Sequence, residues 1–495
     1  MPDHWCHLGV NETKEDWLPQ ELVDGKLRYS QCRKLAAPGS NHSLPCSSWD
    51  YDDSTYIATI VTDFDLVCGR AHWSSLSTMI FYIGSFIGNI LFGYIADKWG
   101  RRASFFSILT VQVIFGTACA FVEDVWSFTI IRFIVGLTFP ALYQIPFVIG
   151  MELMGPSGRI FAGMVVCVFF GSAMCLLGIV ASLIREWRII TIVSNAPFIF
   201  LFSYYWVLPE SPRWLVAAKK LDEASKAIVT IAKCNKFPYD RAVIKRQCEA
   251  LYEQCEIESQ EAMEDERAQL MDLFRTPNLR KKTIIITFIW LVNAIVYNGL
   301  TYNVSNLPVD DYVSFCINGA VEVPAYFLVW PLLDRIGRRW PLFFSMLLGG
   351  LACISTMFIP QHYSWTLSGL AFLGKFGIAA SFAILYIFAG ELYPTVVRAI
   401  GMGMSSMVAG SGLILAPYLV GLGHYVRILP LLIMGTLTIL AGLASVFLPE
   451  TLDAPLPQTL QDAEEFGRSH RTLTCHRKRK PDKPDLDALP LNDFA

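Results

Sequence analysis

Long apolar stretches separated by short polar ones dominate the chain from residue 74 onward. Each holds about 20 residues, enough to cross a hydrocarbon core of ~30 Å as a helix rising ~1.5 Å per residue. The pattern predicts an all-α membrane protein with eleven membrane-spanning helices. The predicted helices are Ser74–Ala96, Ala103–Val122, Trp126–Ile149, Ile160–Leu183, Arg188–Leu208, Thr283–Asn303, Tyr312–Leu333, Pro341–Ile359, Trp365–Phe388, Ala399–Gly423 and Arg427–Leu448.

Three polar segments surround and divide these stretches. Residues 1–73 precede the first stretch, residues 209–282 separate five stretches from six, and residues 449–495 follow the last. We therefore expect an N-terminal segment, a membrane half at 74–208, a partly helical linker, a second membrane half at 283–448 and a tail.

Composition agrees with a membrane protein. Of the 495 residues, 53% are hydrophobic and 17% are charged, against about 25% charged in a soluble domain. The sequence has no phosphate-binding glycine loop, no zinc-type cysteine spacing, no nucleic-acid patch and no readable nucleophile–base arrangement. We therefore expect no enzyme activity, cofactor, metal or nucleic-acid partner, and no direct use of ATP.

Lys and Arg concentrate in alternate short loops, and the opposite loops are nearly free of them. Positive charge marks the cytoplasmic side of a membrane. This predicts a cytoplasmic linker and tail and an extracellular N-terminal segment.

The N-terminal segment has the features of an extracellular domain. Asn11 and Asn41 each begin a glycosylation sequon. Four cysteines in such a segment indicate two disulfides, with three pairings open. These cysteines are Cys6, Cys32, Cys46 and Cys68.

Three motifs occur twice at nearly constant offset. Asp97–Arg102 returns as Asp334–Arg339, Glu152 with Arg159 returns as Glu391 with Arg398, and Pro209-Glu210-Ser211 returns as Pro449-Glu450-Thr451. The offsets are 237, 239 and 240 residues. Two homologous halves in one apolar chain indicate a secondary transporter, with substrate bound between the halves.

The repeated charges form a candidate conformational latch. Opposite charges at the cytoplasmic helix ends could pair in one state and separate in another. The alternative is plain positive-inside topology with solvated charges worth little energy. The candidates are Asp97, Arg101, Arg102, Glu152, Arg159, Asp334, Arg338, Arg339, Glu391 and Arg398.

Two charges fall about ten residues into their predicted spans, Glu322 and Lys375. A charge at that depth costs ~2.5–3.5 kcal/mol on insertion scales, so each should face a cavity or a partner. Three roles stay open. Glu322 could meet a substrate cation, form a structural pair with Lys375, or take up a proton.

Trp290 and Tyr297 are seven residues apart and share a helix face, with Asn293 near the same stripe. Aromatic faces attract ammonium groups, by ~2 kcal/mol or more when desolvated. We expect these residues to contact a cationic substrate; ordinary helix packing is the alternative.

Several segments resemble one family of the major facilitator superfamily, the organic cation/carnitine/organic anion transporters. The resemblance lies in PDHWC (Pro2–Cys6), PESPRWL (Pro209–Leu215), GELYPTVVR (Gly390–Arg398), LPET (Leu448–Thr451), GKFG around Lys375 and SSMVAGSGLILAPYL (Ser405–Leu419). The last two look closest to the organic cation/carnitine branch, including insect-type organic cation transporters.

The resemblance implies two pseudo-symmetric helical halves and a plasma-membrane carrier working by alternating access. It implies that Tyr143, Trp290 and Tyr297 match aromatic positions of the family's cavity. Gly410 stands where cation carriers of the family have aspartate and carnitine carriers have arginine. We expect an organic cation or zwitterion as substrate, with an organic anion or a sugar as alternatives and coupling to Na⁺ or H⁺ open.

The family pattern has twelve spans, and the first is absent before residue 74 of this sequence. That first span lines the central cavity in this architecture. A truncated isoform, an incomplete gene model and a genuine eleven-span protein all stay open, and a truncated, transport-inactive product is a further expectation from the sequence.

Overall fold

The structure is a computed structural model. It describes residues 3–467 apart from 10, 11, 24, 25, 39, 41, 154, 155, 236–238, 265–270, 361, 395, 396, 425, 427, 453, 455, 456, 458 and 459. The predicted glycosylation sites Asn11 and Asn41 lie outside the described residues.

Helices occupy every predicted span. Within the described residues, ten helical segments are long and apolar enough to cross a membrane, and α18 is a shorter apolar helix. The helices are α3 (His72–Trp99), α4 (Arg101–Ala118), α5 (Val125–Leu153), α6 (Pro156–Ile184), α7 (Trp187–Asn195, continued by 3₁₀ turns to Trp206), α12 (Pro277–Tyr302), α13 (Asp311–Ala320), α14 (Glu322–Ile336), α15 (Arg339–Ser355), α16 (Ser364–Leu392), α17 (Arg398–Gly421) and α18 (Leu429–Ser445). The prediction of an all-α membrane protein is confirmed for these segments.

One predicted span consists of two helices. The predicted span Tyr312–Leu333 is present as one helical segment over Asp311–Leu333, interrupted at Val321, where α13 ends at Ala320 and α14 begins at Glu322. Pro324 explains the break, because proline has no N–H and its ring clashes with the carbonyl four residues earlier, here that of Ala320. The break places Glu322 in the first turn of a new helix.

The chain divides into two compact units, which are described separately. The first comprises Met1–Phe92, Phe106–Ala141 and Leu177–Val207. In it, Trp187 packs edge-on against Phe128, with ring centroids 5.6 Å apart. The indole N–H of Trp187 donates to the carboxylate of Asp63 at 2.9 Å. This contact joins the start of α7 to the short helix α2 (Ile60–Asp63).

The N-terminal segment of this unit contains strands that hydropathy does not predict. Three two-stranded antiparallel sheets pair β1 with β6, β2 with β3 and β4 with β5. The strands are β1 (His4–Cys6), β2 (Gln20–Val23), β3 (Lys26–Tyr29), β4 (Arg33–Leu35), β5 (Ser43–Pro45) and β6 (Trp49–Tyr51), with the one-turn helix α1 (Lys14–Trp17) between β1 and β2. Disulfides join Cys6 to Cys46 and Cys32 to Cys68. Strands this short bury little, so the disulfides supply much of the restraint.

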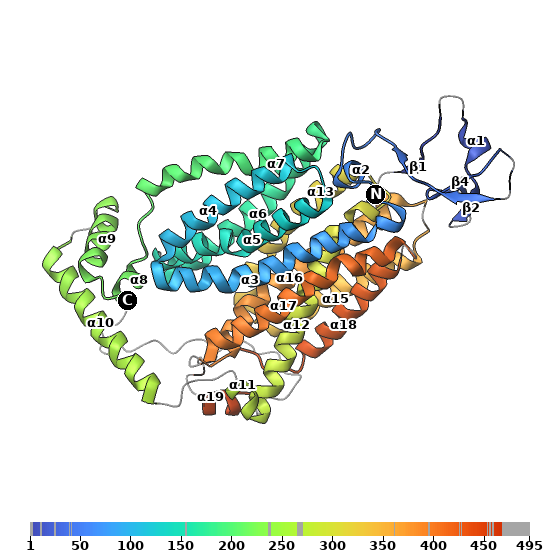
Figure 1. The fold of residues 1–495 in the computed structure, drawn as a ribbon. Helices are drawn as coiled ribbons and strands as arrows, with labels where there is room; N and C mark the ends of the chain where they lie inside the picture. Colours follow the sequence, from blue (N-terminus) through green and yellow to red (C-terminus); the bar gives the residue numbers. More distant parts are fainter. Residues whose placement is uncertain are drawn as a thin grey trace. The chain divides into compact units, whose positions relative to one another are not determined.

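The second unit comprises Gly93–Phe105, Leu142–Leu176 and Leu208–Ala495. Its core lies among α12, α14, α15, α16, α17 and α18. Five of these helices, α12, α15, α16, α17 and α18, are labelled in Figure 1. Small residues let these helices approach closely. A Cβ added to Gly350 of α15 would lie 2.8 Å from the carbonyl oxygen of Gly435 in α18, and one added to Gly377 of α16 would lie 2.6 Å from that of Ser345.

The linker, which the sequence predicts to be partly helical, begins with three helices. They are α8 (Pro212–Ala217), α9 (Leu221–Cys234) and α10 (Arg241–Glu264), and they share a small apolar core. Ser211 caps α8 by accepting the N–H of Trp214 at 3.3 Å, and Pro212 occupies the first helical position, where its missing N–H costs nothing. After α10, the one-turn helix α11 (Asp272–Arg275) leads into α12.

Candidate functional site

Glu322 and Lys375 form a fully buried ion pair inside the second unit. Lys375 Nζ lies 3.1 Å from Glu322 Oε1, and both side chains are 0% exposed. The hydroxyl of Tyr297 donates to Oε1 at 2.7 Å and that of Tyr326 donates to Oε2 at 3.1 Å. Lys375 also donates to the hydroxyl of Thr301 at 2.8 Å. We call these five residues the buried charge cluster.

Three helices supply the buried charge cluster by helical spacing. Tyr297 and Thr301 are four residues apart on α12, and Glu322 and Tyr326 are four apart on α14, so each pair shares a face. Lys375 reaches them from α16, with its ammonium 3.1 Å from the centroid of the Tyr297 ring. The charges are thus paired and hydrogen-bonded, as burial requires.

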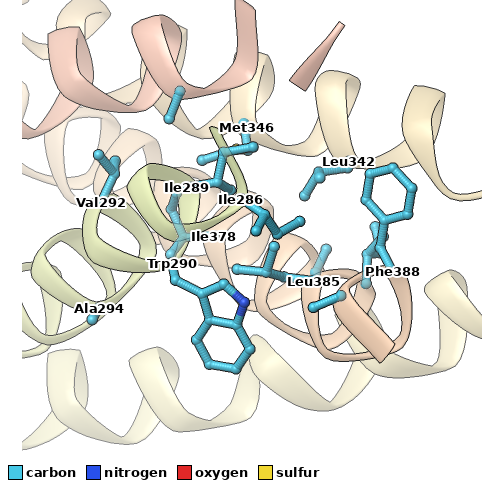
Figure 2. Close-up of a cluster of buried hydrophobic side chains, with 14 of the residues drawn as sticks. Ile286, Ile289, Trp290, Val292, Ala294, Leu342, Met346, Ile378, Leu385 and Phe388 are labelled. Carbon is cyan, nitrogen blue, oxygen red and sulfur yellow. The ribbon is translucent and has the colours of Figure 1, made fainter. Parts of the chain in front are cut away.

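The aromatic candidates lie beside this cluster. Trp290 is 1% exposed and packs edge-on against Tyr386 with centroids 4.5 Å apart, and Phe382 lies 5.9 Å from Trp290 and 5.6 Å from Tyr297. Figure 2 shows the indole pointing away from Ile286 and the other apolar side chains above it. Within the described residues, Nε1 of Trp290 has no hydrogen-bond partner.

Asn293 is buried on the same helix as Trp290. Its carbonyl oxygen accepts a hydrogen bond from the hydroxyl of Ser381 at 2.6 Å. Among the residues that the structure describes, its Nδ2 has no partner. Within the part of the chain that the structure describes, a buried amide donor and a buried indole donor on α12 therefore both lack acceptors, which is unfavourable without a ligand or water.

Tyr143 is less closely associated with these residues. It lies on α5 with 59% of its surface exposed. The structure thus brings Tyr297, Glu322 and Lys375 into direct contact, places Trp290 and Asn293 beside Phe382, Tyr386 and Ser381, and leaves Tyr143 more exposed.

The repeated arginine and glutamate lie close together in both sequence repeats, and only the second pair is hydrogen-bonded among the described residues. Arg101 Nη1 lies 3.1 Å from Asp97, and Arg101 Nε lies 3.8 Å from Glu152. In the second repeat, Arg338 Nε and Nη2 donate to Glu391 Oε1 at 3.2 and 2.9 Å. Each arginine also donates to a backbone carbonyl five residues earlier.

Two glutamates that sequence reasoning assigned no role complete these clusters. Glu210 accepts the backbone N–H groups of Arg101 and Arg102 at 3.0 and 3.2 Å, at the start of α4. Glu450 accepts those of Arg338 and Arg339 at 2.8 and 3.1 Å, at the start of α15. A carboxylate is favourable at a helix N-terminus. The repetition of Pro-Glu-Ser as Pro-Glu-Thr was the signal for this role.

Glycine permits both contacts. Gly100 precedes α4 and Gly337 precedes α15, with φ of 103° and 99°. Residues that have a Cβ rarely adopt this backbone conformation. A Cβ on Gly337 would lie 2.6 Å from the carboxylate of Glu450.

Three other latch candidates are Arg159, Asp334 and Arg398, and the structure describes the side chain of Arg398 only. Arg398 Nε donates to the carbonyl of Tyr393 at 3.3 Å. The side chains of Arg159 and Asp334 lie outside the described residues. Each ion pair above joins residues of the same sequence repeat, and a latch between the repeats stays a prediction.

Two repeated sets of apolar helices are the architecture of the major facilitator fold, and one of these sets contains the buried charge cluster. An inward-open structure of the E. coli xylose transporter XylE superposes with a TM-score of 0.60, covering 82% of this chain and 93% of that one at 17% identity, which shows the fold.

A family model described as sugar (and other) transporter matches residues 40–461. Organic cation transporter 1 of Caenorhabditis elegans is 57% identical over 98% of this chain and 86% of its own length. The human organic cation/carnitine transporter 2 is 33% identical over 97% and 90%. The chain therefore belongs to the sugar (and other) transporter family of the major facilitator superfamily, in its organic cation/carnitine branch.

Proposed function

We propose that this protein carries small organic cations, or zwitterions with a cationic group, across the plasma membrane by alternating access. The N-terminal segment faces the outside, and the linker and tail face the cytoplasm. The observation that carries the proposal is the buried Glu322 carboxylate, which already holds an ammonium group in a desolvated site.

The partners of Glu322 suit a cation that must bind and leave. The hydroxyls of Tyr297 and Tyr326 fix both carboxylate oxygens, so the acceptor is oriented before a ligand arrives. A substrate ammonium could then replace the ammonium of Lys375. Glu322 then stays paired at every stage, and the displaced ammonium of Lys375 keeps the carbonyl oxygen of Tyr297 and the hydroxyl of Thr301 as acceptors.

The aromatic side chains beside the cluster suit the same ligand. Trp290, Phe382 and Tyr386 offer ring faces and edges next to Tyr297. Desolvated contacts between an ammonium and aromatic faces contribute ~2 kcal/mol. The donors of Trp290 and Asn293 that lack acceptors among the described residues could bind the carboxylate of a zwitterion.

The alternatives have weaker support. The ion pair does not separate an anion from a cation, because Glu322 and Lys375 occupy each other equally. The relatives named as cation and carnitine transporters favour a cationic substrate.

The proposed topology rests on charge and on the disulfides. Lys and Arg mark the linker side as cytoplasmic. The disulfides Cys6–Cys46 and Cys32–Cys68 require an oxidising compartment, which is the other side of the membrane.

Uptake measurements test the proposal. Cells expressing the chain receive radiolabelled tetraethylammonium, carnitine, urate and glucose, with surface biotinylation alongside. Saturable uptake of tetraethylammonium or carnitine, without uptake of urate or glucose, is expected. Surface protein that takes up only urate or only glucose would overturn the assignment.

A further inference from the structure

Two thiols face each other where α6 crosses α13. Cys175 Sγ lies 3.2 Å from the carbonyl oxygen of Cys316, and Cys316 Sγ lies 3.5 Å from the carbonyl oxygen of Cys175. The contact is reciprocal, so each side chain is directed at the other residue's backbone. Both residues are half-buried and neither belongs to a disulfide.

Glycines bring the two backbones unusually close at this crossing. A Cβ on Gly319 would lie 2.7 Å from the Cβ of Met174 and 3.3 Å from the backbone nitrogen of Cys175. A Cβ on Gly171 would lie 3.2 Å from the carbonyl oxygen of Gly319. A disulfide needs Cα atoms ~4.4–6.8 Å apart, so a bond between two helices requires a close backbone approach of this kind.

The crossing joins the two sequence repeats. α6 belongs to the first repeat and α13 to the second, and alternating access requires the repeats to move against each other. Cys316 lies five residues after the start of α13 at Asp311, and Cys175 lies nine residues before the end of α6 at Ile184. Arg185, directly after α6, accepts a hydrogen bond from the N–H of Ile57 in the disulfide-bonded segment. The thiols thus lie in the parts of these helices that the proposed topology places toward the outside.

We propose that Cys175 and Cys316 form a redox modification site, at which a two-electron oxidant of the peroxide class joins them in a disulfide that stops transport. The loss of transport rests on the carrier function proposed above. The disulfide would bond α6 covalently to α13 and prevent their separation.

The chemistry balances with hydrogen peroxide as the oxidant. One thiolate sulfur attacks the peroxide, forms a sulfenic acid and releases water. The second thiol attacks that sulfur, forms the S–S bond and releases a second water. Two electrons and two protons pass from the thiols to the peroxide, and a dithiol reductant reverses the change.

A gel assay tests bond formation independently of transport. A protease site is inserted after Glu264 in the full chain, and membranes are treated with hydrogen peroxide and then cut. Cys175 lies in one fragment and Cys316 in the other, while both N-terminal disulfides lie within the first fragment. We expect the oxidised fragments to stay joined until dithiothreitol is added. Cys175→Ser and Cys316→Ser should each abolish the crosslink, whereas the control Cys353→Ser should keep it.

Fragments that separate after oxidation of the unsubstituted chain would overturn the proposal, and so would a crosslink that persists in Cys175→Ser. Uptake is measured in the same cells. We expect uptake to fall in proportion to the crosslinked fraction, to recover with dithiothreitol and to be unaffected by peroxide in Cys175→Ser. Crosslinking without a fall in uptake would refute the proposal that the disulfide stops transport, and it would not affect the proposed carrier function. If no variant transports any cation, the carrier function fails, and the gel still decides whether the bond forms.

Discussion

At the residue scale, the buried charge cluster explains how a membrane helix can hold a carboxylate. Glu322 and Lys375 neutralise each other, and hydroxyl groups satisfy their remaining hydrogen-bonding capacity. Such a pair contributes little net stability compared with apolar residues, because desolvation offsets the attraction. Its presence therefore favours a functional reason for keeping charge at this depth.

Trp290 should matter for affinity more than for folding when it is replaced conservatively. In Trp290→Phe the ring remains, but the weaker aromatic face and the lost N–H should cost ~1 kcal/mol, raising KM for a cationic substrate about fivefold. Kinetic uptake corrected for surface protein measures this change. Trp340→Phe, on α15, is the matched control and should leave KM unchanged. An equal rise of KM in both variants would show that Trp290 contributes to helix packing and not to substrate binding.

Glu12 provides a pH-dependent contact in the N-terminal segment. Hydrogen bonds from Lys34 and from the N–H of Gly9 hold the pKa of the Glu12 carboxyl below its usual value. A depressed pKa means that the contact stabilises the fold above the unfolded-state pKa and is lost as the pH falls through the folded-state pKa. Glu12→Gln should therefore speed amide exchange in α1 at neutral pH.

The difference between Glu12→Gln and the unsubstituted chain should disappear in acid, where the natural carboxyl is protonated as well. Hydrogen–deuterium exchange compared at matched pH measures it. A difference that persists at low pH would show that the carboxylate charge is not the cause.

At the element scale, hydropathy predicts the spans because burial in lipid needs long apolar runs. It does not predict the break between α13 and α14, which depends on Pro324 acting on a carbonyl one turn earlier. It also misses Thr301, because only the packing of α12 against α16 brings its hydroxyl to Lys375. Tyr326 lies four residues after Glu322 on α14, so the spacing alone indicates that contact.

The α6–α13 crossing makes a prediction at this scale. Gly319→Ala should be more disruptive than Gly171→Ala, because its Cβ would lie 2.7 Å from a neighbouring Cβ, whereas the nearest atom to a Cβ on Gly171 is a methyl group of Val323 at 3.0 Å. Overpacking costs ~1–3 kcal/mol. We expect a lower melting temperature and slower uptake for Gly319→Ala.

The two variants are compared by thermal unfolding of the purified protein and by cellular uptake corrected for the amount of protein at the surface. Gly369→Ala is the control, since nothing lies within 4 Å of its added Cβ. Equal behaviour of all three variants would mean that the crossing is looser than the structure shows.

At the scale of the whole molecule, duplication explains the fold and the charged ends together. The repeated motifs predict two related halves, and membership of the major facilitator superfamily confirms that prediction. The sequence also brought Arg338 and Glu391 into one candidate group, which the structure shows in contact. The sequence did not reveal that Glu210 and Glu450 accept backbone N–H groups. That role depends on the positive φ of Gly100 and Gly337, which precede α4 and α15.

The duplication predicts equivalent effects of equivalent substitutions. Glu210→Gln and Glu450→Gln should each lower stability by about 1 kcal/mol, because each removes a negative charge from a helix N-terminus. Melting temperatures of the purified variants measure this. Glu253→Gln, on the linker helix α10, is the control. A loss at one repeat without a loss at the other would contradict the equivalence.

The double substitution Glu322→Gln/Lys375→Met tests the central claim most directly. Either single substitution leaves a buried charge without its partner, at ~3–5 kcal/mol, and should reduce the protein at the cell surface. The double variant removes both charges and should reach the surface again. Surface biotinylation and tetraethylammonium uptake are measured together. The predicted result is surface protein with no cation uptake, because the site no longer has the Glu322 carboxylate that binds the substrate cation. Uptake with an unchanged KM would show that the pair only stabilises the fold.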